Sequence, residues 1–89
     1  MVSPAVIGLL GNCYAQLGQN EKAVETLLKA AKKADNNTLS PQFLLQAGQI
    51  YESLGQADKA LDCYKQIKQN YQQSYLYADM DKYIERLSN

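Results

Sequence analysis

The chain has 89 residues, 46% of them apolar, and its nine basic residues balance nine acidic ones to give a formal net charge of zero. This length suits one small domain. The charge balance argues against nucleic acid or an anionic membrane surface as the main partner, because both require a basic excess. Histidine is absent, and Cys13 and Cys63 lack CxxC spacing, so neither a zinc site nor a disulfide framework is expected.

The first 37 residues predict a helical hairpin. Ser3 suits an N-cap, because its hydroxyl can accept from the free N–H groups of the first turn, and Pro4 suits the first helical position. Gly18 can adopt the left-handed conformation that ends a helix, and a second helix is expected about two residues later. Apolar residues recur at helical spacing. They are Ile7, Leu10, Tyr14 and Leu17 in the first helix, and Ala23, Val24, Leu27, Ala30 and Ala31 in the second. Both cysteines also fall among apolar residues and are expected to be small core side chains.

The same pattern returns 37 residues later, after the turn-forming linker 35–39. Ser40-Pro41 repeats Ser3-Pro4, which predicts a second N-cap at Ser40. The apolar positions of this second hairpin are Leu44, Ala47, Tyr51, Leu54, Ala60, Leu61, Tyr64, Ile67 and Tyr71. Both units carry small residues where the two helices of a hairpin should cross closely. These are Gly11, Ala23, Gly48 and Ala60.

Residues 75–87 predict a closing helix with one apolar and one charged side, as the end of a stacked array requires. The apolar side consists of Leu76, Met80, Tyr83, Ile84 and Leu87. We therefore expect an all-α domain over residues 1–89, with one unit at 3–37, a second at 40–73 and a capping helix at 74–89. We also expect this domain to be part of a longer chain.

Matching residues in both units carry a family resemblance. They are Leu10-Gly11, Tyr14, Gly18, Ala23, Leu27 and Ala30 in the first unit, and Ala47-Gly48, Tyr51, Gly55, Ala60, Tyr64 and Ile67 in the second. This pattern resembles the tetratricopeptide repeat consensus, although the 37-residue spacing exceeds the usual period of about 34. The resemblance implies two helix-turn-helix hairpins and a cap in a short right-handed superhelix that acts as a protein-interaction scaffold. Residues 71–87 also look like the C-terminal end of bacterial cell-envelope members of that family, which are often anchored in the membrane with their repeats in the periplasm. This likeness implies a periplasmic location and, as an alternative function, an accessory domain of a longer membrane-anchored envelope protein. Without that likeness, a cytoplasmic location is expected.

The resemblance further implies that the first helix of each unit lines a groove for a partner protein or peptide. The groove residues carried over to this chain are Ala5, Gly8, Asn12, Ala15 and Gln16 in the first unit, and Gln42, Leu45, Gln49, Glu52 and Ser53 in the second. Their amide groups can pair with the backbone of an extended peptide. A clamp for a C-terminal carboxylate is not expected, because Gly8 stands at the basic position of that clamp and Gln49 replaces its second asparagine.

The first helix has apolar residues on more than one face, which suggests burial on two sides. Val6, Leu9 and Cys13 form the candidate association surface, and the alternatives for what covers it are a preceding repeat, a second copy of the chain or a partner protein. No nucleophile–base pair or phosphate-binding loop is visible, so the sequence predicts a non-enzyme without cofactor or metal. The uncharged first twenty residues are interrupted by Pro4 and three glycines, so direct membrane insertion is not expected either.

Overall fold

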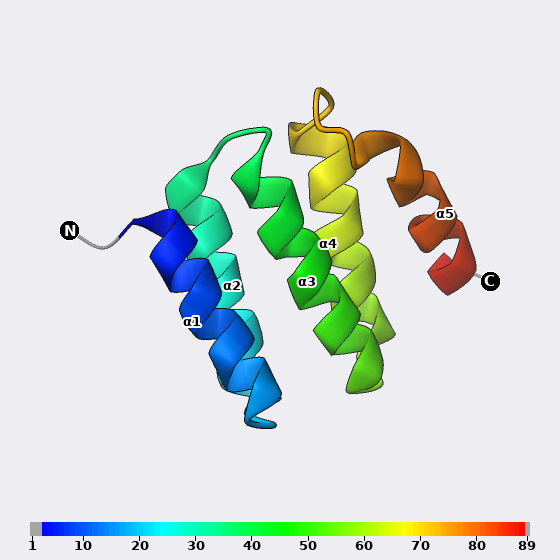
Figure 1. The fold of residues 1–89 in the computed structure, drawn as a ribbon. Coiled ribbons are helices and arrows are strands. Elements are labelled where there is room, and N and C mark those ends of the chain that lie inside the picture. Colours follow the sequence, from blue (N-terminus) through cyan, green and yellow to red (C-terminus); the bar gives the residue numbers. More distant parts are fainter. Residues whose placement is uncertain (1–2, 89) are drawn as a thin grey trace.

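The computed structural model describes residues 3–88, and these residues form five α-helices. They are α1 (Pro4–Gln16), α2 (Asn20–Ala34), α3 (Leu39–Ser53), α4 (Ala57–Asn70) and α5 (Tyr77–Ser88). Each helix packs against the next one in the chain, and α1 also touches α3. Figure 1 shows α1 in front of α2 and α3 in front of α4, with α5 closing the C-terminal side. The predicted all-α array of two hairpins and a closing helix is thus confirmed.

The two hairpins turn through the same hydrogen-bonded motif. Gly18 and Gly55 have φ angles of 79° and 76°, in the left-handed region that glycine adopts without steric cost. In the first hairpin, the Gly18 N–H donates to the Ala15 carbonyl at 3.1 Å and the Gln19 N–H donates to the Tyr14 carbonyl at 2.9 Å. The second hairpin repeats both bonds. This is the Schellman motif, and it satisfies carbonyls that the end of a helix leaves free.

The start of α3 differs from the prediction. The helix begins at Leu39, so Ser40 lies inside it, fully buried, and the predicted N-cap at Ser40 was wrong. Its hydroxyl donates to the Ala31 carbonyl at 2.7 Å and accepts from the Asn36 N–H at 3.1 Å. Asn36 serves the helix start instead, because its side-chain oxygen accepts from the N–H groups of Thr38 and Leu39 at 2.9 and 2.7 Å. Ser40 therefore joins α3 to the end of α2. At Ser3 the predicted cap is confirmed by a 3.3 Å bond from the Val6 N–H.

Replacing Ser40 with alanine is expected to lower the free energy of unfolding by about 1–2 kcal/mol, because a buried hydroxyl that bridges two segments is lost. Ser53→Ala is the matched control, since the exposed Ser53 hydroxyl bonds only to the Ile50 carbonyl of its own helix. That change should stay within about 0.5 kcal/mol. Urea unfolding followed by circular dichroism measures both. Equal losses would mean that the Ser40 hydroxyl does not stabilise the junction of the two hairpins.

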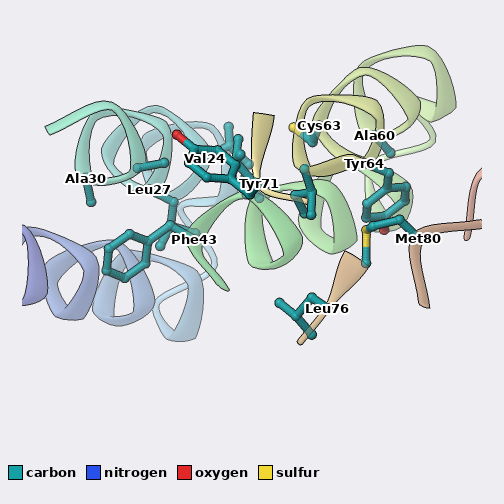
Figure 2. Packing of buried hydrophobic residues seen from close by; sticks show 14 residues of the cluster. Val24, Leu27, Ala30, Phe43, Ala60, Cys63, Tyr64, Tyr71, Leu76 and Met80 are labelled. Atoms are coloured by element: carbon teal, nitrogen blue, oxygen red, sulfur yellow. The ribbon is translucent and has the colours of Figure 1, made fainter. Parts of the chain in front are cut away.

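The core runs without interruption from the first hairpin into α5. Tyr64, Leu27, Ile67 and Met80 are its largest fully buried apolar side chains. Figure 2 shows this cluster, with Leu27 and Phe43 toward one end and Tyr64 and Met80 toward the other. The predicted close crossings are confirmed at the glycines. A Cβ on Gly11 would lie 2.8 Å from Leu27 Cγ, and a Cβ on Gly48 would lie 2.5 Å from Tyr64 Cε1.

The apolar stripe predicted for the first helix was partly wrong. Leu10 and Leu17 are exposed, and the buried residues of α1 are Gly8 and Gly11. The helix turns its glycines toward α2 and α3, because only a residue without a side chain allows this approach. Leu54 is exposed at the equivalent place in the second hairpin. The closing helix starts at Tyr77 rather than at residue 75.

Candidate partner-binding surfaces

Four uncharged amide side chains lie on equivalent sides of α1 and α3. We call Asn12 and Gln16 of α1 with Gln42 and Gln49 of α3 the amide face. A helix turns about 100° per residue, so in the 37-residue register these positions fall within an arc of about 40° on each helix. Gln16 and Gln49 are exposed, and Asn12 and Gln42 are half-buried. The face therefore presents donors and acceptors to solvent without charge.

Three predicted groove residues are held within the fold. Gly8 is buried, and a Cβ there would overlap the Phe43 ring, so it is a packing position rather than a partner contact. Leu45 is half-buried and packs against the core cluster. Glu52 is half-buried, and its carboxylate already has two partners inside the molecule. The Tyr64 hydroxyl donates to it, and the Arg86 guanidinium donates to both of its oxygens at 2.7 and 2.8 Å.

The bonds of Glu52 belong to a network that ties α3, α4 and α5 together. Burial, and after it the hydrogen bond to Glu52, raises the pKa of Tyr64 well above its ordinary value, so the phenol keeps its proton and its bond to Glu52 even in alkaline solution. The Tyr83 ring lies 5.0 Å from the Tyr64 ring, and the Arg86 guanidinium lies 5.2 Å from the Tyr83 centroid. Sequence reasoning missed this network, because its members are far apart in the chain and no local spacing signals their contact.

The predicted association surface lies on an exposed apolar side of α1. Val6, Leu9 and Cys13 are exposed, and Leu10 and Leu17 extend the same side. We call these five residues the open face. At about 100° per residue they occupy an arc of about 100°. Four of the six large apolar residues that are exposed among residues 3–88 belong to this face.

The two cysteines have different environments. Cys63 is buried in α4, where burial, and then the charge of Asp62, raises the pKa of its thiol to about 11. It is the small core side chain that the pattern predicts. Cys13 is exposed on the open face, so the same prediction was wrong for Cys13. Both thiols are free.

A depression of about 420 Å³ lies among α2, α3 and α4 in the described chain, lined partly by Ala31, Leu44 and Gln66, and it includes no residue of either face. Within residues 3–88, no three His, Cys, Asp or Glu side chains are grouped so that they could hold a metal ion. None of the helices in this range has the length and apolar character needed to cross a membrane.

Stacked helical hairpins with a shared core and a closing helix define the class of helical repeat proteins. Comparison of the sequence with models of known protein families identifies the family within this class. Two models, each described as a tetratricopeptide repeat, match residues 5–36 and residues 42–74, which correspond to the two hairpins. The chain therefore belongs to the tetratricopeptide repeat family. No curated protein and no solved structure matched it in the same comparisons.

Proposed function

We propose that the chain is a protein-interaction scaffold that binds an extended segment of a partner across the amide face. Tetratricopeptide repeats generally mediate protein–protein interaction, and two of them are present here. The observation that carries the proposal is the placement of uncharged amides on equivalent sides of two consecutive first helices, at Asn12, Gln16, Gln42 and Gln49. Glu52 and Leu45 border this face from within the fold.

The chemistry of the face favours recognition of peptide backbone over charged side chains. An amide group both donates and accepts, so each can pair with an N–H or a C=O of an extended chain. Two such residues on neighbouring helices would hold the peptide at two points. The buried Gly8 stands where a carboxylate clamp would need a basic residue, so the face is not suited to gripping a C-terminal carboxylate.

Peptides that bind the chain can be selected from a random library displayed on phage, with the chain immobilised. These selected peptides are the probe for the proposed function. We expect selected peptides to bind the parent, and Asn12→Ala and Gln49→Ala each to weaken that binding about fivefold, the value of one hydrogen bond. Gln69→Ala is the control, because Gln69 is an exposed amide on α4. All three variants should keep the helicity of the parent. If Asn12→Ala and Gln49→Ala both bind the selected peptides as tightly as the parent does, the amide face is not the binding surface.

A further inference from the structure

The open face of α1 has the character of an internal packing surface. In the 37-residue register, its first four positions recur at matching places in α3 and α5. Val6, Leu9, Leu10 and Cys13 correspond to Phe43, Gln46, Ala47 and Ile50, and then to Met80, Tyr83, Ile84 and Leu87. In α3 and α5 these positions are buried or half-buried against the preceding hairpin. In α1, Val6 is 54% exposed, whereas its counterparts Phe43 and Met80 are 6% and 0% exposed.

The reason for this difference is the position of α1 in the array. The α2–α3 and α4–α5 contacts cover these positions in the later helices, but no helix within residues 3–88 precedes α1. Burying the open face would remove large aliphatic side chains from water, which is favourable at about 25 cal/mol for each Å² of apolar surface. A contiguous exposed apolar surface of this kind marks a protein-interaction site.

The charges of the molecule indicate what can cover this face. Helix α1 contains no charged residue, and the whole chain is electrically neutral, so two copies can approach through α1 without repulsion. The other end of the array does not match it. The outer side of α5 presents exposed Asp79, Lys82 and Glu85, which would lose hydration against an apolar surface. Head-to-tail stacking of copies is therefore disfavoured, whereas pairing of two open faces matches apolar with apolar.

We propose that the open face of α1 binds the open face of a second copy of this chain, giving a two-fold symmetric dimer. Such an interface uses the same surface on both partners, so each residue of the open face is buried in both copies. Cys13 lies inside the arc of the face and Leu9 lies at one edge of it, and both would be covered in the dimer. The amide face borders the open face, since Gln16 lies about 20° from Leu9 at 100° per residue, whereas Asn12 and the two α3 amides lie outside the open face. The dimer proposal uses none of the amide side chains, so it does not depend on the proposed peptide-binding function.

Light scattering of the intact chain over a concentration series, from micromolar to sub-millimolar, tests the dimer. We expect the mass to rise from 10.0 kDa toward twice that value. Leu9→Lys should weaken the dimer about 100-fold or more, because it buries an unpaired charge in an apolar interface. Tyr75→Lys is the matched control, since Tyr75 is exposed and lies outside α1, and this variant should dimerise as the parent does. Circular dichroism checks that both variants remain folded.

The reactivity of Cys13 locates the interface independently. We expect alkylation of Cys13 by iodoacetamide to slow as the concentration of the parent rises and to stay constant in Leu9→Lys. Buried Cys63 should react slowly in every case and acts as the internal reference. The proposal is overturned by a parent chain that stays monomeric throughout, by a dimer that Leu9→Lys leaves unchanged, or by a Cys13 that reacts equally fast in monomer and dimer. These outcomes concern the dimer alone, and peptide binding is measured separately through Asn12→Ala and Gln49→Ala.

Discussion

Tyr64→Ala is expected to lower the free energy of unfolding by about 3–5 kcal/mol, as is usual when a large core aromatic is removed. Tyr64 is fully buried where α3, α4 and α5 meet. Its ring packs beside Tyr83 and over Gly48, and its hydroxyl reaches Glu52. Small domains are stable by only about 5–15 kcal/mol, so a loss of this size leaves much of the population unfolded.

One further variant separates the ring of Tyr64 from its hydroxyl, and another serves as a surface control. Tyr64→Phe keeps the packing and removes only the bond to Glu52, so it should cost about 1–2 kcal/mol. Tyr75→Ala removes a tyrosine that is 71% exposed and should change stability by about 0.5 kcal/mol at most. Urea unfolding of the three variants under one condition gives the comparison. If Tyr64→Ala were no less stable than Tyr75→Ala, Tyr64 could not be the centre of this core.

The hairpins were predictable because their signals are local. Gly18 and Gly55 end helices through a conformation that few other residues adopt, and the small residues at the crossings mark where the two backbones approach. Because both signals recur at one spacing, each unit supports the interpretation of the other. The closing helix was also predictable, because its apolar residues recur at helical spacing, and Met80 of that stripe is fully buried.

The errors arose where a neighbouring element decides the role of a residue. Ser40-Pro41 resembles Ser3-Pro4, yet α2 precedes Ser40 and offers the Ala31 carbonyl, so the hydroxyl bonds there instead of capping a helix. Leu10 was placed in the core by its spacing alone, and it is exposed because no described helix covers that side of α1.

The candidate binding residues show the same limit. Glu52 fitted the expected groove by its position, but Tyr64 and Arg86 engage its carboxylate from helices that the spacing within α3 cannot reveal. Gly8 likewise fitted the groove until the Phe43 ring was found against it. Periodicity assigns a residue to a side of its helix, whereas its availability to a partner depends on what the rest of the chain brings to that side.

Gly48→Val is expected to destabilise the chain by about 3 kcal/mol through overpacking. A Cβ at this position would lie 2.5 Å from Tyr64 Cε1, and the ring is fully buried, so moving it would disturb the side chains packed around it. Gly48→Ala should cost less, because alanine favours a helix by about 1 kcal/mol over glycine and so offsets part of the clash. Gln49→Val places the same β-branched side chain one residue further along α3, at an exposed position, and should cost well under 1 kcal/mol.

A double-mutant cycle tests whether the clash is with Tyr64 itself. Tyr64→Leu replaces the ring by a smaller side chain and so makes room over residue 48. Gly48→Ala should therefore cost less in the Tyr64→Leu background than in the parent, with a coupling energy of about 0.5–3 kcal/mol, as found for residues in contact. Urea unfolding of the parent, both single variants and the double variant measures it. Strict additivity would mean that Gly48 is small for a reason other than Tyr64, and the close crossing of α3 and α4 would need another explanation.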